Sequence, residues 1–327
     1  MLQSYNKEQA VRRINYLSEQ GKPFIFIINY LQSCSYIEEV DKLDPSFVLY
    51  NFNGFTNQSP TLLCNKVIRW QITPQPLSQY KQSFDYVMQN IHNGNSFLTN
   101  LTCSTPITTN LSLKEIFLHS KAMYKLWVKD AFVVFSPEIF VRINGTLISS
   151  YPMKGTIDAT LPSACQQLMD DPKEAAEHAT IVDLIRNDLS LVAEKVFVNR
   201  YRYADTLQTN SGPILQTSSE ISGVLPDDYR SRLGDILFKL LPAGSITGAP
   251  KQKTMDIIAR AETYERDFYT GITGYFDGEN LDSAVMIRFI EQRGDKLYFK
   301  SGGGITCKSD LKSEYNEMKQ KVYVPIY

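Results

Sequence analysis

Residues 272–304 read ITGYFDGENLDSAVMIRFIEQRGDKLYFKSGGG, and three β-rich segments follow one another in this stretch. The segments are ITGYF at 272–276, AVMIRFI at 284–290 and KLYFKS at 296–301. Strands in adjacent runs, without strict alternation of strand and helix, are typical of antiparallel sheets. The stretch therefore favours an α+β fold with mostly antiparallel sheets.

Strand and helix patterns continue outward from this stretch. Further strands are predicted at 24–30, 46–52, 131–136 and 146–151, with the last two joined by an Asn144-Gly145 turn. Apolar residues at helical spacing and capping residues predict helices at 78–92, from Ser112, at 171–192, 228–241 and 250–261, and from near Asp310. These patterns predict strands and helices in number but not their topology.

The composition of the 327-residue chain excludes several classes of protein. Its 34 Lys and Arg residues balance 35 Asp and Glu residues, whereas a nucleic-acid-binding surface usually brings a basic excess. Five widely spread cysteines without a C-x-x-C pair argue against a zinc ribbon and a disulfide framework. Phe24–Ile28 is too short to span a membrane, and the first residues lack a signal-peptide pattern. We expect a cytoplasmic protein without nucleic-acid or membrane partners.

Two pairs of glutamates suggest a metal site. Glu174 and Glu177 are three residues apart in one predicted helix, and Glu314 and Glu317 are three apart in another, so each pair shares a helical face. Glu177 borders the apolar stripe of its helix, where an unpaired carboxylate would be costly. Mg²⁺ is a hard cation that carboxylates bind. Helix capping by Glu174 and an ion pair between Glu317 and Lys321 are the structural alternatives.

Two glycine-rich segments are candidate anion sites. Gly244 and Gly248 precede a predicted helix start at Pro250, where free backbone N–H groups could face a ligand. The segment is not a Walker A motif, so a carboxylate suits it better than a nucleoside triphosphate, and a simple helix cap is the alternative. Three consecutive glycines at 302–304 allow close approach of a ligand and could form an anion-binding nest.

Arg288 and Lys154 are candidate cations of a site. Arg288 interrupts the apolar segment AVMIRFI and could clamp a carboxylate, with a structural salt bridge as the alternative. Lys154, in YPMKGT, would become a nucleophile if burial lowered its pKa, and an ordinary solvated lysine is the alternative. Glu138, in FSPEIF, is its candidate acid partner. The three histidines show neither metal-ligand spacing nor a nearby nucleophile motif.

Six motifs in a fixed order resemble the chorismate-utilising enzymes, a family that includes the anthranilate, aminodeoxychorismate, isochorismate and salicylate synthases. The motifs are SPE at 136–138, PMKGT at 152–156, EHATIVDLIRNDLS at 177–190, GSITGAPK at 244–251, TGYF at 273–276 and SGGGIT…SEYNE at 301–317. The match is dense over 131–322 and thin over 1–130. The resemblance implies a single chorismate-binding domain over 1–327, with no glutaminase or lyase domain.

The resemblance also implies how the site works. Two stacked antiparallel sheets, flanked by helices, would bind chorismate and Mg²⁺ between them. Glu177 and Glu314 would bind the metal, completed by Glu174 and Glu317, and Glu138 would be the general acid that protonates the departing C4 hydroxyl. The substrate-binding residues implied by the matching motifs are Arg288, Tyr275, Gly302, Gly303, Gly304, Ser245 and Thr247.

Lys154 decides the branch of the family. The matching motif tends to have Ala in anthranilate synthases and Lys in aminodeoxychorismate synthases, so the resemblance implies component I of the latter, an enzyme of the transaminase class. A neutral Lys154 would add at C2 of chorismate and expel the C4 hydroxyl, before ammonia displaces it to give 4-amino-4-deoxychorismate for folate synthesis. Ammonia would come from solution or from a separate glutamine amidotransferase subunit. Anthranilate synthase component I and a non-catalytic chorismate-binding subunit are the alternatives.

The sequence departs from the family pattern in three ways. NSFLTNLT at 95–102 contains no lysine, which disfavours the branch that activates water to make isochorismate or salicylate, and Leu98 breaks the family pattern there. Gln216 or Leu215 stands where a histidine is common near the substrate ring. The abbreviated first 130 residues imply that the tryptophan-binding pocket of longer members is missing.

Overall fold

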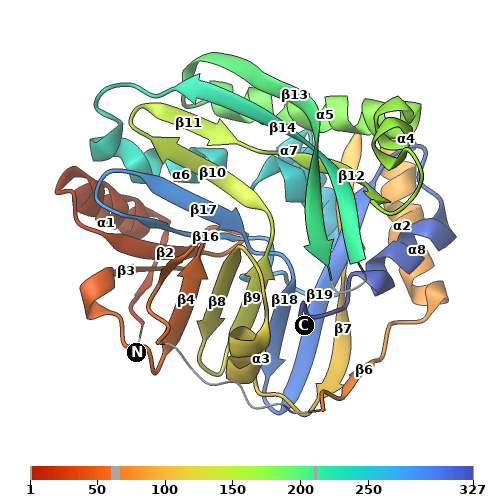
Figure 1. Cartoon of the computed structure of the whole chain (residues 1–327), viewed down its shortest axis with the longest axis horizontal. Coiled ribbons are helices and arrows are strands. Elements are labelled where there is room, and N and C mark those ends of the chain that lie inside the picture. The colour runs from red at the N-terminus through yellow and green to blue at the C-terminus, as the bar shows by residue number, and fades with distance from the viewer. Residues whose placement is uncertain (1, 60–66, 210–211, 327) are drawn as a thin grey trace.

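Two β-sheets form the framework of the computed structural model, which describes residues 2–59, 67–209 and 212–326 (Figure 1). Every strand pairing in these residues is antiparallel. The predicted α+β class with two antiparallel sheets is therefore confirmed.

The larger sheet begins with N-terminal strands and ends at a long hairpin. In spatial order its strands are β1 (Ser4–Tyr5), β3 (Ser35–Glu39), β2 (Phe24–Ile28), β16 (Ile272–Phe276), β17 (Leu281–Val285), β10 (Ile139–Asn144), β11 (Leu147–Ser150), β14 (Gly212–Val224) and β12 (Met153–Asp158), and β13 (Glu194–Thr209) also pairs with β14. β12 thus lies at one edge, beside β14.

The smaller sheet contains the glycine-rich strand. In spatial order its strands are β15 (Gly248–Ala249), β7 (Leu98–Thr109), β19 (Lys296–Ile305), β18 (Phe289–Arg293), β9 (Phe132–Ser136), β8 (Tyr124–Val128), β4 (Val48–Phe52) and β5 (Phe55–Thr56), and β6 (Trp70–Ile72) also pairs with β7. Gly302, Gly303 and Gly304 continue the ladder of β19 opposite β7, so they do not form a separate nest.

Helices cover both sheets. They are α1 (Lys7–Glu19), α2 (Leu77–His92), α3 (Leu113–His119), α4 (Ala164–Asp170), α5 (Pro172–Ser190), α6 (Leu233–Leu240), α7 (Lys251–Ala261) and α8 (Leu311–Gln320), with 3-10 turns η1 (Val40–Lys42), η2 (Tyr229–Arg232) and η3 (Gly244–Ile246). The predicted helix starts are confirmed where capping decides them: Ser112 and Glu115 form a reciprocal capping box, and Asp171 and Asp310 accept backbone N–H bonds at the starts of α5 and α8.

The prediction of one strand over AVMIRFI at 284–290 is wrong. The chain leaves the larger sheet at Val285, the end of β17, and enters the smaller sheet at Phe289, the start of β18. Arg288 lies in the crossing between them with a left-handed φ of 53°. An apolar run looks the same whether it stays in one sheet or passes through the core between two sheets, so periodicity could not separate the two cases.

The predicted hairpin between the strands at 131–136 and 146–151 is also wrong. An additional strand, β10, lies between them, and the Asn144-Gly145 turn joins β10 to β11. β9 belongs to the smaller sheet, whereas β10 and β11 belong to the larger one. Glu138 therefore falls at the point where the chain changes sheets.

Apolar side chains fill the space between the sheets and beneath the helices. Ile27 of β2, Phe52 of β4, Tyr124 of β8 and Met286 of the crossing belong to one fully buried cluster between the sheets. A second cluster lies under α1, α5 and α6, and another joins α2, α7 and α8 to β7 and β19. Figure 1 shows α2 and α8 beside β7 and β19, which brings α8 to the glycine-rich strand.

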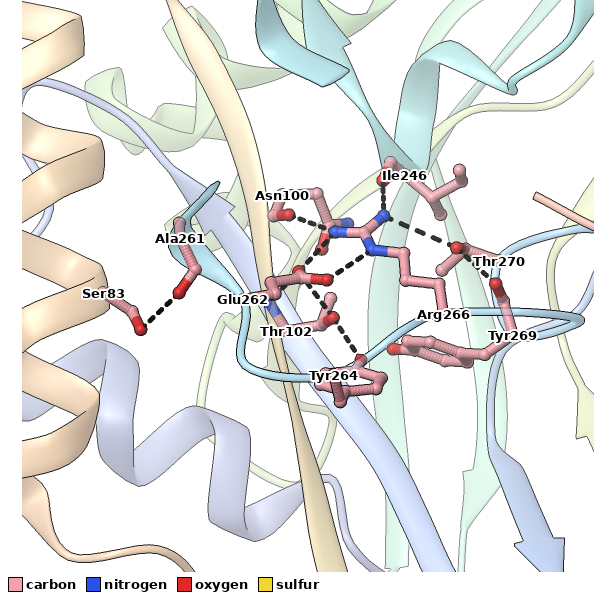
Figure 2. Close-up of polar contacts among 10 residues, drawn as sticks. All are labelled: Ser83, Asn100, Thr102, Ile246, Ala261, Glu262, Tyr264, Arg266, Tyr269 and Thr270. Atoms are coloured by element: carbon pink, nitrogen blue, oxygen red, sulfur yellow. Dashed lines mark hydrogen bonds and ion pairs between the residues drawn. The ribbon is translucent and has the colours of Figure 1, made fainter. Parts of the chain in front are cut away.

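A buried ion pair joins three separate segments of this framework (Figure 2). Arg266 Nη2 lies 2.7 Å from Glu262 Oε1, and each side chain is 2% exposed. The guanidinium also donates to the carbonyl oxygens of Asn100 and Ile246, at 2.6 and 2.9 Å, and the carboxylate accepts from the backbone N–H of Thr102 at 2.9 Å. The pair thereby fixes the end of α7 to β7 and to η3.

No helix in the described ranges combines the length and the apolar character needed to cross a membrane.

We predict that Glu262→Gln destabilises the chain by about 3–5 kcal/mol, because it leaves the buried Arg266 charge without a counter-ion. Asp85→Asn is the control: its pair with Lys81 is 55% exposed on both sides and should contribute about 0–1 kcal/mol. Urea unfolding followed by circular dichroism measures both. Equal losses in the two variants would show that the buried network does not hold these segments together.

Candidate active site

A cavity of about 260 Å³ lies between the edge of the larger sheet and strands β7 and β19 of the smaller one. β12 and α5 line one side of it, and β7 and β19 contribute to the other. The predicted site residues that line the cavity are Glu138, Lys154, Glu177, Ser245 and Gly304.

Lys154, on β12, directs its amine at a predicted metal ligand on α5. Its Nζ lies 2.7 Å from Glu177 Oε2, with the two side chains 35% and 17% exposed. Burial opposes the charged amine, but the hydrogen bond and charge of Glu177, with the charges of Glu317 and Glu174, outweigh it and raise the pKa of Lys154. In this arrangement burial alone does not lower the pKa of Lys154, and the amine is an ammonium ion held by carboxylates.

Each glutamate pair packs against a strand at a glycine, where the missing Cβ leaves room for the carboxylates. A Cβ at Gly155 would lie 2.8 Å from Glu174 Oε2, and a Cβ at Gly303 would lie 3.4 Å from both Glu314 Oε2 and Glu317 Oε1. α5 therefore presents its pair to β12, and α8 presents its pair to β19. Both pairs lie near Lys154, since the charges of Glu174, Glu177 and Glu317 all raise the pKa of that amine.

The carboxylates of this cluster differ in how well nearby cations balance their negative charge. Burial first, and then the neighbouring Glu177, raise the pKa of Glu174; burial and the neighbouring Glu317 do the same to Glu314. Burial also opposes ionisation of Glu317, but its ion pair with Lys321, 2.7 Å away, prevails and lowers its pKa. The alternative of a Glu317–Lys321 ion pair is thus confirmed.

The donor set suits a divalent cation in its chemistry. All four side chains offer carboxylate oxygens, the ligands that Mg²⁺ prefers, and a cation would relieve the repulsion within each pair. In the present side-chain positions, no three His, Cys, Asp or Glu side chains of the described chain form a group able to hold a metal ion. Glu177 is instead occupied by Lys154. The residues that could hold Mg²⁺ are Glu174, Glu177, Glu314 and Glu317.

Glu138, between β9 and β10, is the candidate acid that lines the cavity. Ser245, in η3, donates a hydrogen bond from Oγ to Glu138 Oε1 at 2.5 Å. Burial raises the pKa of Glu138, while the Ser245 hydroxyl and the charge of Lys321 lower it by less. The protonated form of Glu138 is therefore favoured relative to that of an exposed glutamate, which suits a general acid.

Arg288 and Lys321 form a second cationic group beside β19. Arg288 Nη1 donates to the carbonyl oxygen of Lys321 at 2.9 Å, and its guanidinium lies 4.8 Å from the ring centre of Tyr323. Lys321 Nζ donates to the carbonyl oxygen of Gly302 at 2.8 Å. Sequence reasoning missed Lys321 because it weighed this residue only as a partner for Glu317. The signal in the sequence was that Lys321 lies four residues after Glu317, a predicted metal ligand, and therefore close to the site.

Tyr275 and Thr247 lie away from the cavity. Tyr275 stacks on Phe55 with ring centres 4.2 Å apart, and it packs against the cluster between the sheets. Thr247 is fully buried, and its carbonyl oxygen accepts the Asn100 N–H at 3.0 Å. The structure therefore does not bring these two residues to Lys154 and Glu138. Leu98, one of the departures from the family pattern, does line the cavity.

Two neighbours of Lys154 were not recognised in the sequence. His178 is fully buried on α5, and its Nε2 shares a 2.7 Å hydrogen bond with Ser219 Oγ. Burial lowers the pKa of His178, against a smaller opposing effect of the Lys154 backbone. Thr217, also fully buried, donates from Oγ1 to the carbonyl oxygen of Lys154. No sequence signal links Thr217 to Lys154, because only strand pairing brings them together.

The model for the chorismate binding enzyme family matches residues 32–326. An uncharacterized PabA-like protein of Pasteurella multocida is 50% identical over 97% of this chain and 98% of its own length. Aminodeoxychorismate synthase component 1 of Bacillus subtilis is 30% identical over 75% of this chain, which covers 54% of that enzyme. Anthranilate synthase component 1 of Spirochaeta aurantia is 31% identical over 57% of this chain and 39% of its own length.

Solved structures share the fold. A 2,3-dihydroxybenzoate-specific isochorismate synthase of Bacillus anthracis has a TM-score of 0.73 at 17% identity, covering 98% of this chain and 89% of its own. The menaquinone-specific isochorismate synthase of Escherichia coli has a TM-score of 0.72 at 17% identity, covering 98% of this chain and 82% of its own. At these identities the likeness establishes the two-sheet architecture.

We predict that Ser245→Ala raises the pKa of Glu138 further, because it removes a hydroxyl that stabilises the carboxylate. A folded-state pKa above the unfolded value means that the contribution of Glu138 to stability is present at low pH and lost as pH rises through the folded pKa. Carbon-13 NMR of labelled glutamate carboxyls, assigned with Glu138→Gln, measures the shift. Ser150→Ala is the control, since that hydroxyl donates to the Phe140 carbonyl. An unchanged Glu138 pKa in Ser245→Ala would contradict the assigned contact.

Proposed function

The chain belongs to the chorismate binding enzyme family, and we propose that it aminates chorismate to 4-amino-4-deoxychorismate. The observation that carries the proposal is that the Lys154 amine and the Glu138 carboxyl line one cavity. A nucleophile and a carboxyl group with a raised pKa in the same cavity suit the displacement of a hydroxyl group. Both branches occur among the relatives at about equal identity, but the aminodeoxychorismate synthase of Bacillus subtilis matches 75% of this chain and the anthranilate synthase of Spirochaeta aurantia 57%. This wider match and the lysine at position 154 support the aminodeoxychorismate branch.

In the proposed reaction, two substitutions replace a single difficult one. The Lys154 amine adds at C2 of chorismate, the ring double bond shifts, and the C4–O bond breaks as Glu138 gives its proton to the hydroxyl, which leaves as water. Ammonia then adds at C4, the ring double bond shifts back, and the bond between C2 and Lys154 breaks, which regenerates the amine. The nitrogen now at C4 gives up one proton, which restores Glu138. The net change is chorismate plus ammonia to 4-amino-4-deoxychorismate plus water.

Lys154 must lose its proton before it can act. The ion pair with Glu177 stabilises the protonated amine. Glu177 must therefore bind another partner when the substrate is present. We infer that Glu174, Glu177, Glu314 and Glu317 bind Mg²⁺, which would supply a positive charge for one substrate carboxylate. With Glu177 so engaged, the main cause of the raised Lys154 pKa would be removed, and the amine, whose side chain is 35% exposed, would pass its proton to solvent.

The second substrate carboxylate needs a different cation. Gly304 lines the cavity, and Lys321 and Arg288 lie beside the same strand. We infer that this group binds that carboxylate, with Ser245 orienting the acid Glu138. We also infer that ammonia comes from solution or from a separate glutamine amidotransferase subunit, and that the product serves 4-aminobenzoate and folate synthesis.

We predict that the purified chain, given chorismate, MgCl₂ and ammonium at alkaline pH, forms a product that an added lyase converts to 4-aminobenzoate, detected by fluorescence after HPLC. Glu138→Gln should lower kcat by about 100-fold or more, because it removes the proton donor. Lys154→Ala should abolish the covalent adduct that mass spectrometry detects in the acid-quenched wild-type reaction. Lys195→Ala, an exposed lysine on β13, is the control and should behave as wild type.

Two outcomes of this assay would overturn the proposal. Anthranilate as the product would assign the chain to the other branch. Absence of both products, even with glutamine and an amidotransferase subunit added, would indicate a chorismate-binding protein without this chemistry.

We predict that MgCl₂ raises the thermal midpoint of the chain, because a ligand that binds only the folded state stabilises it. Glu314→Gln should weaken Mg²⁺ binding by about 10-fold or more, as the loss of a carboxylate ligand does. Glu8→Gln, at an 84% exposed carboxylate on α1, is the control and should respond like wild type. A magnesium-dependent shift that is equal in all three proteins would contradict a site at these glutamates.

A further inference from the structure

The backbone of β12 is irregular at Lys154. Met153 pairs with Ser218 and Thr156 pairs with Gln216, so Lys154 and Gly155 together face one residue of β14, Thr217. Two residues opposite one define a β-bulge, which bends the strand and redirects a side chain. Gly155 has a φ of 87°, and its missing Cβ leaves room for Glu174. The amine of Lys154 thus projects from a bulge, not from a regular strand.

Thr217 holds this bulge from across the sheet. A bulge leaves a backbone group without its regular ladder partner, and a buried carbonyl oxygen needs a donor. The fully buried Thr217 supplies one, because its Oγ1 donates to the carbonyl oxygen of Lys154. A side-chain hydroxyl therefore replaces a ladder hydrogen bond at the proposed nucleophile.

Ser219 contacts α5, the helix that contains Glu177. Its Oγ accepts the Arg202 N–H at 2.9 Å and shares a 2.7 Å hydrogen bond with His178 Nε2, one residue after Glu177. Residues two apart on a strand point to the same face. Thr217 and Ser219 therefore fix, from one face of β14, the two elements that the Lys154–Glu177 contact connects.

We propose that Thr217 and Ser219 are positioning residues that set the direction and distance of the Lys154 amine in the cavity. The proposal rests on the proposed function insofar as Lys154 is the nucleophile. Displacement of a reacting group by about 1 Å can cost about 100-fold in rate, so a hydroxyl outside the cavity can control turnover.

The decisive comparison is Thr217→Val with Thr217→Ser. Valine keeps the shape and loses the donor, whereas serine keeps the donor. Thr217→Val should lower kcat by about 10-fold or more with KM for chorismate changed by less than about 3-fold, and Thr217→Ser should stay within about 3-fold of wild type. Ser222→Ala is the matched control: it removes a buried hydroxyl of the same strand that bonds Ser149, 2.7 Å away.

A second measurement does not depend on turnover. Acylation of Lys154 by an amine-reactive ester, followed by peptide mass spectrometry without substrate and referenced to the exposed Lys195, reports how firmly the amine is held. Thr217→Val should raise the relative rate by about 3-fold or more, since the amine leaves its 2.7 Å contact with Glu177 more readily. Ser219→Ala should act in the same direction, and Thr217→Ser and Ser222→Ala should match wild type.

The outcomes separate this proposal from the proposed function. Altered Lys154 labelling in a chain that makes no aminated product would support the positioning role while the reaction fails. Unaltered labelling in both Thr217→Val and Ser219→Ala would overturn the positioning role, whatever the product. A loss of kcat in Ser222→Ala equal to that in Thr217→Val would also overturn it.

Discussion

Charge compensation among half-buried carboxylates is the constraint on which the site depends. Two helices bring four glutamates to strands whose glycines leave room for them, and such a cluster is costly without cations. Lys154 compensates one pair through Glu177, and Lys321 compensates the other through Glu317. Lys154 lies on β12 of the larger sheet, whereas Lys321 lies at the end of α8 and donates to Gly302 of β19. The charge of Glu317 also acts on Lys154, so the charge balance links the edge of the larger sheet to α8 and the glycine-rich strand.

The sequence predicted those parts of the site that depend on local spacing. The i+3 glutamate pairs and the N-caps Asp171 and Asp310 could be recognised because helical geometry is set by neighbours in the chain. Local patterns did not predict the structure around Arg288, where one apolar segment includes the end of a strand in the larger sheet and the start of a strand in the smaller one. A helix boundary depends on residues close in sequence, whereas a change of sheet depends on partners far away in sequence.

Strand pairing explains most of what sequence reasoning missed. Thr217 has no feature that marks it, and it acquires a role only because the bulge of β12 lies opposite it. Tyr275 is the opposite case, a residue that a motif marks but that lies away from the cavity. The motif suggested a contact with substrate, but the register of β16 directs the ring to Phe55. Motifs identify which residues a family keeps together, while register decides which face each of them occupies.

The protonation states of Glu138 and Lys154 have different causes, and this difference orders the proposed reaction. Burial raises the pKa of Glu138, so its protonated form is favoured before any ligand arrives. Carboxylate charge keeps the proton on Lys154, so the nucleophile is masked until Glu177 is otherwise engaged. Under the proposed function, a cation held by these glutamates would supply the positive charge that Lys154 now supplies to Glu177, and Glu177 would then no longer hold the ammonium ion. An amine released only in that state would be protected from reacting with other electrophiles while the site waits for its substrate.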